Sequence, residues 1–425
     1  MPLDCIHLPQ LLFPAPGVDL TRFAVIACDQ FTAEPSYWAQ AERFVGDAPS
    51  CLRLTLPEIW LGADDGVRAA AIHRTMQDYL SESVLCPLPE GLMLIERDTG
   101  RGSPRRGVLL AFDLEAYDET PGSDAPIRPT EATVTERVPP RLAIRAEAPF
   151  ELPHIMLFVD DPAHALLEPL FAACAEQAPL YDFELMQGGG HITGRLVSPG
   201  VQTEAFFSRL AAHAGACRTR AAAGAVPPLF ATGDGNHSMA AAKAHWERVK
   251  HTLSPAEQER HPARWVLAEL INLHDPSICF EAVHRLLLNA DPADVLHFLE
   301  GWAAAHARPD AAPAALPCRY QGQEHNTLSL PLAPGELPVS ALQQALDAYL
   351  AARPQVGIDF IHGTDTLRHL SDAAGRIGFL LPDFAKDALF PYVAAHGVLP
   401  RKTFSMGTAL EKRYYLEARM IRSDR

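Results

Sequence analysis

The residues best suited to chemistry stand together in one short segment, Gly233-Asp-Gly-Asn-His-Ser238. An apolar run precedes it and a run with helical spacing follows. A strand, a glycine turn and a helix start in this order place free backbone N–H groups and the positive helix end at one point, which suits phosphate. Asp234 could hold a divalent cation, and His237 could contact a phosphate or transfer a proton. In the alternative, Asp234 only caps the helix and His237 lies on its surface.

The elements that position this segment follow from apolar spacing. Met239, Ala242, Trp246 and Val249 predict a helix over 236–250 with one buried face. We also expect a helix start at Asp161-Pro162 and a linker at 307–317. Short strand-like runs alternate with helical ones throughout, which predicts an α/β or mixed α+β fold. Expected strands include 23–27, 92–96, 108–113, 153–159, 191–197 and 229–232, and expected helices include 66–80, 204–214 and 340–350.

Length and composition set the limits. At roughly 150 residues per domain, 425 residues predict two or three domains. We divide the chain into an N-terminal α/β lobe (1–125), a central domain with the Asp234 segment (126–306) and a C-terminal α/β lobe (318–425). The formal charge of −16 disfavours nucleic acid and anionic membranes as partners. The expected partner is therefore a small-molecule substrate or a nucleotide, and the sequence indicates no oligomeric state.

Cellular location is predicted from the N-terminal segment, the apolar runs and the cysteines. The N-terminal segment lacks the basic and apolar regions of a signal peptide, and no apolar run approaches the roughly 20 residues that cross a bilayer. The eight cysteines are scattered without zinc-type spacing. We expect reduced thiols and a cytoplasmic protein.

A family resemblance extends beyond the Asp234 segment. Asp234-Gly-Asn-His-Ser238 resembles the Asp-Gly-His-His-Arg loop of a family catalogued as domain of unknown function 1015. The other segments that resemble the family occur in the same order, and they are Arg128-Pro-Thr-Glu131, Pro140-Arg-Leu142, Leu157–Pro162, Trp265–Asn272, Val283–Leu286 and Leu399–Phe404. The chain is identified as a member of this family on these matches, which assign no activity.

A more distant resemblance carries chemistry. The same loop occurs in nucleotide-dependent free serine kinases, which implies a ParB/sulfiredoxin-like core with additional mixed-sheet lobes. It implies that Gly233, Gly235, Asn236 and Ser238 lie against nucleotide phosphates, that Asp234 holds Mg²⁺, and that ATP or ADP is the nucleotide. Glu131 matches the glutamate that deprotonates the acceptor hydroxyl. Two positions differ, because Asn236 replaces a histidine and Ser238 replaces an arginine that would clamp phosphate in bidentate fashion.

Three further residues in family-like segments could contact the phosphates. Arg285 and Lys402 are candidate cations in place of the missing arginine, and His284 precedes Arg285. The alternatives are surface charges for Arg285 and Lys402, and a hydrogen-bonded core histidine for His284. For Glu131 the alternative is an acid in the first turn of a helix.

Three functions remain open at this point. The first is a small-molecule phosphotransferase, with an amino-acid kinase of the serine type as its specific form. The second is a regulatory protein that binds a nucleotide or metabolite without turnover, which Ser238 favours. The third is a metal-dependent hydrolase that uses His154, His191 and His237. The sequence contains none of the motifs of P-loop NTPases, Rossmann dehydrogenases or α/β-hydrolases.

Overall fold

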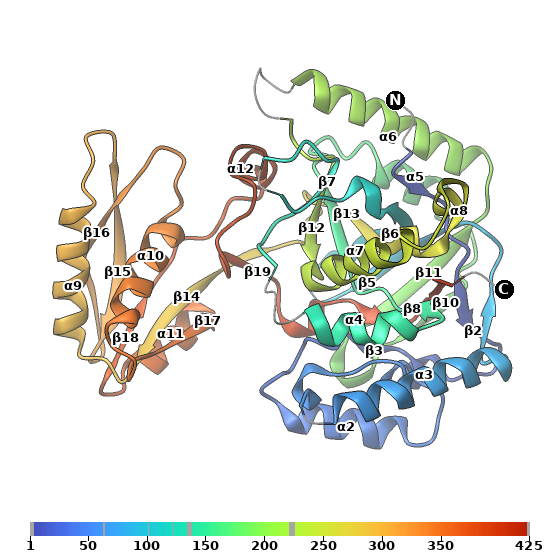
Figure 1. The fold of residues 1–425 in the computed structure, drawn as a ribbon, viewed down its shortest axis with the longest axis horizontal. Coiled ribbons are helices and arrows are strands. Elements are labelled where there is room, and N and C mark those ends of the chain that lie inside the picture. Colours follow the sequence, from blue (N-terminus) through green and yellow to red (C-terminus); the bar gives the residue numbers. More distant parts are fainter. Residues whose placement is uncertain are drawn as a thin grey trace. The chain divides into compact units, whose positions relative to one another are not determined.

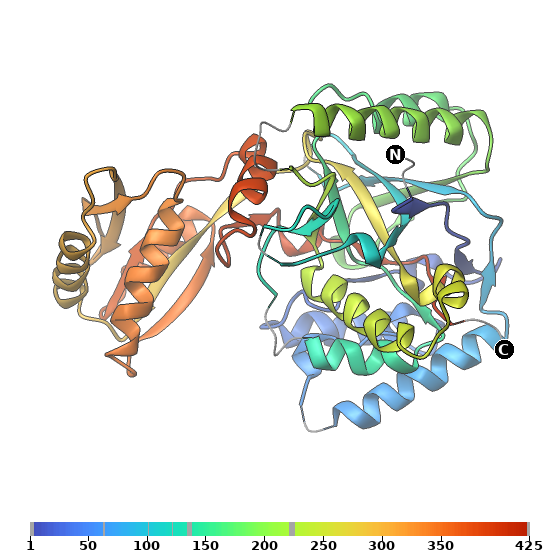
Figure 2. The same cartoon turned by 45° about the horizontal axis from the view of Figure 1, so that its top comes forward.

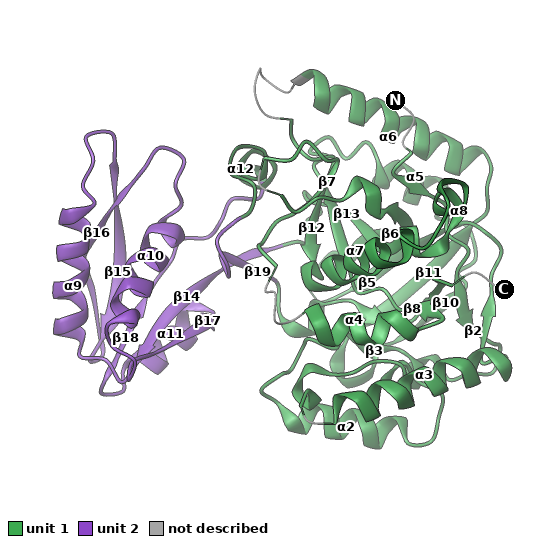
Figure 3. Cartoon of the chain, viewed as in Figure 1, with its two compact units in different colours: residues 1–278, 387–398, 407–425 green, residues 279–386, 399–406 purple. Residues whose placement is uncertain are grey.

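The computed structural model describes residues 4–62, 64–100, 102–120, 122–133, 138–220 and 226–422. The chain forms two compact units (Figure 3). Unit 1 comprises residues 1–278, 387–398 and 407–425, and unit 2 comprises residues 279–386 and 399–406. Unit 1 is thus assembled from three separate stretches of chain. The three-part division at 125 and at 306–318 stays a prediction.

Unit 1 is built around a mixed β-sheet (Figure 1). Its described strands follow the order β10-β11-β5-β6-β13-β9-β12-β7, and β1 also pairs with β6. The pairs β12–β7 and β13–β9 are parallel and the other pairs are antiparallel. These strands are β1 (Ile6–His7), β5 (Leu92–Asp98), β6 (Arg105–Asp113), β7 (Ile127–Pro129), β9 (Met156–Val159), β10 (Tyr181–Glu184), β11 (His191–Val197), β12 (Phe230–Asp234) and β13 (Trp265–Asn272).

Two hydrophobic cores lie on opposite faces of this sheet. Successive side chains of a strand point to opposite faces, and the residues of β5 divide accordingly. Met93 and Ile95 belong to one core, whereas Leu92 and Leu94 belong to the other. The sheet is therefore covered on both sides, which explains why its central strands are nearly continuous apolar runs.

Helices and short strand pairs complete unit 1. Helix α4 packs against both α3 and α7, and α5 packs against α6 (Figures 1 and 2). The helices are α1 (Leu20–Phe23), α2 (Pro35–Val45), α3 (Asp65–Ser81), α4 (Val138–Glu147), α5 (Leu167–Ala173), α6 (Val201–Arg220), α7 (Asn236–Lys250), α8 (Pro255–Arg260) and α12 (Leu389–His396). The small pairs are β2 (Leu12–Pro14) with β4 (Leu85–Pro87), β3 (Val25–Ile26) with β20 (Tyr414–Tyr415), and β8 (Phe150–Glu151) with β21 (Arg419–Met420).

Unit 2 is an antiparallel sheet with three helices. The described strands follow the order β16-β15-β18-β14-β17, with β19 also paired to β14. Gln321 and Gly322 both have positive φ in the two-residue turn between β15 and β16, as a tight hairpin requires. The elements are β14 (Phe280–Leu288), α9 (Pro292–Ala305), β15 (Ala312–Tyr320), β16 (Gln323–Leu332), α10 (Pro338–Ala351), β17 (Gly357–His362), α11 (Thr364–Ser371), β18 (Arg376–Phe379) and β19 (Phe404–Met406).

The mixed α/β class is confirmed, and so are the helix over 236–250 and the strand over 191–197. The other expected strands and helices occur with shifted ends, apart from the first strand. The strand expected over 23–27 is shorter, because Asp19 caps a helical turn that includes Phe23 and only Val25–Ile26 pair with β20. No described helix combines the length and apolarity that crossing a membrane requires.

Two further expectations are wrong. The helix start at Asp161-Pro162 fails because His164 has a positive φ, so α5 begins only at Leu167, and the Asp161 carboxylate accepts a hydrogen bond from the Leu166 N–H at 2.8 Å. The linker over 307–317 fails because its second half lies in β15. Pro313 is tolerated there because β18 pairs with β15 only at residues 318 and 319, so no second strand needs the missing N–H.

Candidate functional site

The Asp234 segment joins β12 to α7 through two glycines that no other residue could replace without strain. A Cβ at Gly233 would lie 2.5 Å from the Phe158 ring. Gly235 has a φ of +78°, and a Cβ there would lie 3.0 Å from the Ile155 Cα. The alternative in which Asp234 caps α7 is wrong, because Asp234 ends the strand and Gly235 is the N-cap residue without a side-chain cap. The Asp234 carboxylate is consequently available for another partner.

Two oxygen atoms beside this turn are buried with no hydrogen-bond partner in the described part of the chain. They are Asp234 Oδ2 and Asn236 Oδ1. The Lys412 Nζ lies 3.6 Å from Asp234 Oδ2, too far for a hydrogen bond but within ion-pair distance. A buried acceptor without a donor is costly, so these oxygens mark a place where a ligand or cation would lower the free energy.

The donor set fits a magnesium ion that arrives with a phosphate. Mg²⁺ prefers oxygen ligands, keeps several waters and is usually held by one or two protein carboxylates together with substrate phosphates. Asp234 Oδ2 and Asn236 Oδ1 would be its protein ligands here. Within the described residues there is no group of three or more His, Cys, Asp or Glu side chains that could hold a metal ion by themselves.

Glu131 lies at the same edge of the sheet as Asp234. Strand β7 pairs in parallel with β12, so that Pro129 stands opposite Thr232. Glu131 lies two residues after Pro129, and Asp234 lies two residues after Thr232. Because the strands are parallel, both residues lie at the same edge of the sheet. The Thr130 hydroxyl donates to the Thr232 carbonyl at 2.6 Å and holds the two chains together there. Glu131 is half-buried and precedes α4, so the alternative of a first-turn helix acid is wrong.

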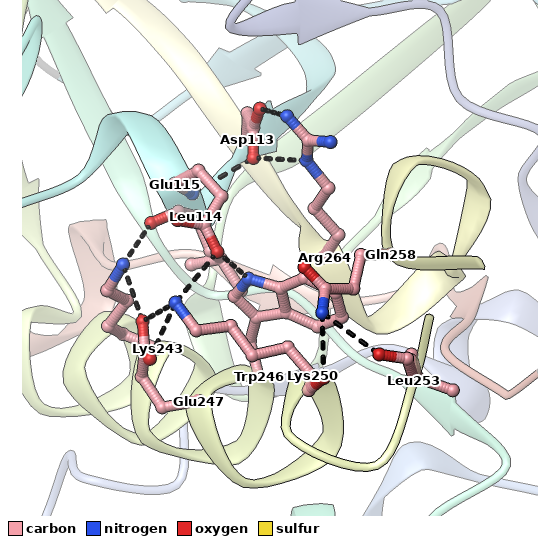
Figure 4. Close-up of polar contacts among 10 residues, drawn as sticks. All are labelled: Asp113, Leu114, Glu115, Lys243, Trp246, Glu247, Lys250, Leu253, Gln258 and Arg264. Carbon is pink, nitrogen blue, oxygen red and sulfur yellow. Dashed lines mark hydrogen bonds and ion pairs between the residues drawn. The ribbon is translucent and has the colours of Figure 1, made fainter. Parts of the chain in front are cut away.

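Helix α7 is held in place by contacts along its second half (Figure 4). The Trp246 indole N–H donates to the Glu115 carboxylate, and the Lys250 Nζ lies 3.1 Å from the same oxygen. The Lys243 Nζ donates to the Leu114 carbonyl at 2.8 Å. Burial of Glu115 disfavours its charge, but the bonds from Trp246 and Lys250 outweigh this and lower its pKa. The helix that begins at the Asp234 segment is thus fixed to the turn after β6.

The first turn of α7 meets a buried histidine through Ser238. The Ser238 Oγ lies 3.1 Å from Nε2 of His154, and the His154 Nδ1 lies 2.8 Å from the Tyr415 hydroxyl. The Tyr415 hydroxyl also lies 3.2 Å from the Cys28 sulfur. Burial lowers the pKa of His154, although Asp29 and Asp234 oppose that effect. Burial likewise raises the pKa of the Cys28 thiol to about 11, so the sulfur remains protonated at neutral pH.

Asp29 contributes a negative charge near the Nε2 atom of this histidine. Its Oδ2 lies 4.0 Å from the His154 Nε2. Burial opposes ionisation of Asp29, but His154, a hydrogen bond from Gln30, Arg141 and Lys412 together lower its pKa. The carboxylate is therefore ionised at neutral pH and would stabilise a positive charge on the imidazole.

A pocket of about 130 Å³ opens beside Ser238 and His154. Its charged lining is paired internally, Arg141 with Glu58 and Arg145 with Glu151. The rest of the wall is mainly apolar, and it includes Leu54, Leu56, Leu61, Met76, Ile144, Phe150 and Leu152. An engineered cavity of roughly 150 Å³ admits benzene, so this pocket suits a molecule of that size rather than a whole nucleotide.

The remaining predicted residues lie in unit 2. Arg285 is fully buried, donates to Gln343 and to the carbonyls of Val283, Arg401 and Lys402, and lies over the Phe360 ring. The structure therefore brings Arg285 and Lys402 together, and the surface alternative for Arg285 is wrong.

His284 is buried in the same unit. It accepts from the Leu381 N–H at 3.1 Å and contacts the Thr364 hydroxyl, as expected for a hydrogen-bonded core histidine. Roles for these three residues toward a phosphate stay predictions.

The histidines of the hydrolase hypothesis lie on different elements. His154 contacts Ser238, and half-buried His237 is the second residue of α7. His191 lies on β11 between the carboxylates of Asp182 and Glu184.

Four residues near the Asp234 segment are missing from the sequence-based site, namely Lys412, Tyr415, Asp29 and Arg141. They come from chain segments far from residue 234. Arg141 lies in Pro140-Arg-Leu142, a segment that resembles the family, but nothing in the local sequence gives it a role. For Asp29 a weak signal existed, since it follows a short apolar run at which a strand was expected.

The fold and the site define a mixed α/β protein with an oxygen-lined turn at the start of a helix. Its family follows from comparison with known proteins. Residues 12–351 match the model of the family described as "Protein of unknown function (DUF1015)". This match covers most of the chain, so the protein belongs to the DUF1015 family. No curated protein is significantly similar to it.

Several solved structures are similar over much of the chain. A conserved hypothetical protein from Pyrococcus furiosus has a TM-score of 0.37 and 9% identity, covering 72% of this chain and 94% of that one. A free serine kinase in complex with ADP has a TM-score of 0.39 and 7% identity, with coverages of 72% and 91%. SbnI from Staphylococcus aureus, truncated at its C-terminus, has a TM-score of 0.34 and 11% identity, with coverages of 70% and 83%. Similarity at this level assigns no activity to the present chain.

Proposed function

We propose that this protein transfers a phosphoryl group from ATP or ADP to a small hydroxylated acceptor. The observation that carries the proposal is the pair of buried oxygens, Asp234 Oδ2 and Asn236 Oδ1, without hydrogen-bond partners in the described chain. They stand at the start of a helix of fifteen residues, where backbone N–H groups and the helix dipole favour phosphate. Lys412 adds a cation at the same point.

Each part of this site has a defined task. Gly233 and Gly235 let the backbone approach the phosphates, and Asp234 with Asn236 would hold Mg²⁺ between them. When bound, Mg²⁺ neutralises charge that develops on the phosphate oxygens. Lys412 supplies positive charge near the Asp234 carboxylate, a task for which the family resemblance suggests Arg285 and Lys402. Glu131, at the same sheet edge, would accept the proton of the acceptor hydroxyl.

The acceptor is expected in the pocket beside Ser238. A volume of about 130 Å³ fits a molecule of amino-acid size. Because the arginines and glutamates of its wall neutralise one another in pairs, the lining suits a neutral or zwitterionic acceptor better than a polyanion. A serine-type amino-acid kinase is the specific form of the proposal.

Thermal unfolding with nucleotide tests the proposal. A ligand that binds only the folded state increases the free energy of unfolding, by about 2.7 kcal/mol at a concentration one hundred times its Kd. The melting temperature rises as a result. ATP or ADP with Mg²⁺ should produce this rise in the unaltered protein, and Asp234→Asn should abolish it. Asp160→Asn is the matched control, because Asp160 also follows a sheet strand but at the opposite edge. The absence of a shift with either nucleotide would refute the proposal.

A second candidate is a nucleotide-binding regulatory protein without turnover. The observation that favours it is Ser238, which stands where the family loop has an arginine, so one phosphate clamp is missing. Incubation with ATP or ADP, Mg²⁺ and a panel of amino acids and sugars distinguishes the two candidates. Formation of a phosphorylated product supports the transferase, whereas nucleotide binding without any product supports the regulatory protein.

A further inference from the structure

Ser238 combines two features that the proposed transfer reaction does not yet use. It is the third residue of α7, in the same helical turn as Asn236, and therefore lies next to the proposed phosphate position. Its Oγ also lies 3.1 Å from a buried imidazole nitrogen, His154 Nε2. A hydroxyl that is close both to a phosphate and to a proton acceptor is arranged as a nucleophile.

The hydrogen bonds around His154 agree with one consistent assignment of protons. If the Ser238 hydroxyl donates to Nε2, the ring carries its proton on Nδ1 and donates it to the Tyr415 hydroxyl oxygen at 2.8 Å. The Tyr415 hydroxyl then donates to the Cys28 sulfur at 3.2 Å, and the Cys28 N–H donates back to the tyrosine oxygen at 3.3 Å. Tyr415 thus holds the ring in the tautomer that accepts from serine.

A charge on the imidazole would also be stabilised. The Asp29 Oδ2 lies 4.0 Å from His154 Nε2, the nitrogen that would receive the proton. In serine hydrolases an aspartate bonded to Nδ1 stabilises the imidazolium without taking the proton itself. Here Nδ1 faces Tyr415, and Asp29 would stabilise the charge from the Nε2 side. Nucleophile, base and carboxylate therefore come from α7, from the segment before β9 and from the segment after β3.

We propose that Ser238 is itself phosphorylated by the bound nucleotide, so that it serves as a covalent phosphoryl carrier or as a self-modification site. The inference rests on the proposed function, because the nucleotide must bind at the Asp234 segment. The Ser238 Oγ forms a bond to the terminal phosphorus of ATP or ADP, and the bridging phosphorus–oxygen bond breaks. ADP or AMP leaves with the electron pair of that bond, and the hydroxyl proton passes to His154 Nε2.

The product would be stable where it forms. A phosphoserine in the first turn of a helix gains from the helix dipole and the nearby backbone N–H groups. Lys412, next to Asp234 at the start of the helix, adds positive charge there. Where the family loop has an arginine that would bind phosphate, this chain would then have a serine that receives the phosphoryl group.

The test uses the full chain, Mg²⁺, and ATP or ADP labelled on the terminal phosphate. We expect label in the protein, and peptide mass spectrometry should place one phosphoryl group on Ser238. Ser238→Ala should lose the label, while Ser208→Ala, which alters an exposed helical serine of the same unit, should keep it. Ser238→Thr, which retains a hydroxyl, guards against a folding defect and should keep part of the label.

His154→Gln should slow labelling by roughly a hundredfold or more, the usual contribution of a general base. A nucleotide-induced rise in melting temperature without phosphoserine at position 238 would overturn this inference and leave the proposed function standing. Label that persists in Ser238→Ala would overturn it as well. No rise in melting temperature and no label would overturn the proposed function and the inference together.

Discussion

The Asp234 segment of unit 1 and the Arg285 cluster of unit 2 both contain polar residues that sequence reasoning selects, yet their contacts differ in kind. At the Asp234 segment, buried oxygens of Asp234 and Asn236 have no hydrogen-bond partner within the described residues. In the Arg285 cluster, a fully buried guanidinium donates to one side-chain oxygen and three backbone carbonyls. The Asp234 segment thus has acceptors that are unsatisfied within the described chain, whereas the Arg285 guanidinium is hydrogen-bonded within its own unit.

This difference shows that polar groups in a protein interior can have two roles. A buried polar group that is fully bonded stabilises or specifies a fold, whereas a buried acceptor without a donor lowers stability until a ligand arrives. We therefore expect changes in the Arg285 cluster to alter the stability of the protein and changes at the Asp234 segment to alter nucleotide binding. Three predictions test this division and a fourth compares one buried histidine of each unit, in order of decreasing effect.

Arg285→Met should destabilise the protein by about 3 kcal/mol or more. The substitution leaves three backbone carbonyls without their donor, at roughly 1–3 kcal/mol for each one that water cannot reach, and the bond to the Val283 carbonyl is fully buried. Chemical denaturation measures the loss. The control is Arg308→Met, in the same unit, which removes an exposed side chain paired with exposed Asp310. Its stability should stay within about 0.5 kcal/mol of the original protein. A similar small effect for Arg285→Met would contradict the structural role.

Gly235→Ala should cost about 2 kcal/mol of stability and remove the nucleotide response. The left-handed conformation costs a non-glycine residue roughly 1–2 kcal/mol, and the new Cβ would lie 3.0 Å from the Ile155 Cα. Gly363 is a matched control because it also precedes a helix with a φ of +82° but has only Thr366 Oγ1 nearby, at 3.7 Å. Gly363→Ala should lose about 1 kcal/mol and keep nucleotide binding. If Gly235→Ala and Gly363→Ala respond equally to nucleotide, Gly235 has no specific role in nucleotide binding.

Lys412→Met should weaken nucleotide binding by about tenfold, or about 1.4 kcal/mol, because it removes a cation that lies 3.6 Å from Asp234 Oδ2. Lys402→Met is the comparison, since the family resemblance suggests Lys402 for the same task. Isothermal titration with Mg²⁺ and ATP or ADP gives both affinities. If Lys402→Met has the larger effect, the clamp implied by the resemblance is correct and the division between the two regions is wrong.

The smallest effect concerns two buried histidines, one in each unit. Burial lowers the pKa of His245 to about 4 and also lowers the pKa of His284. The unfolded chain then binds more protons than the folded one below about pH 6.5, so stability falls as the pH drops toward the folded pKa. His245→Gln and His284→Gln should each reduce the loss of stability between pH 7 and pH 5, as measured by denaturant midpoints. An unchanged loss in both variants would show that other groups cause the pH dependence.

The local part of the site was predictable from the sequence. The strand, the two glycines and the helix over 236–250 follow from patterns within about twenty residues, and they agree with the structure. Asp234 was recognised as a candidate ligand for the same reason. The choice between cap and ligand was not decidable locally, because it depends on Gly235 occupying the N-cap position.

The distant part of the site was not predictable. Lys412 and Tyr415 reach the Asp234 segment through the pairing of β20 with β3 and through the bonds of Arg413 to Pro153 and Glu269. A two-residue strand has too little pattern to reveal its partner. Arg285 shows the same limit in unit 2. Charged residues are rarely buried, and its acceptors at Arg401 and Lys402 come close through the pairing of β14 with β19.

The assembly of unit 1 from three stretches of chain has a consequence for how the protein is made. Lys412 and Tyr415 belong to the last stretch, so a ribosome must first synthesise all of residues 279–386. At the usual rate of translation this interval lasts on the order of ten seconds. During that time the Asp234 segment exists without its cation and His154 without its tyrosine partner. The proposed nucleotide site would thus reach its full affinity only after residues up to Tyr415 have been synthesised.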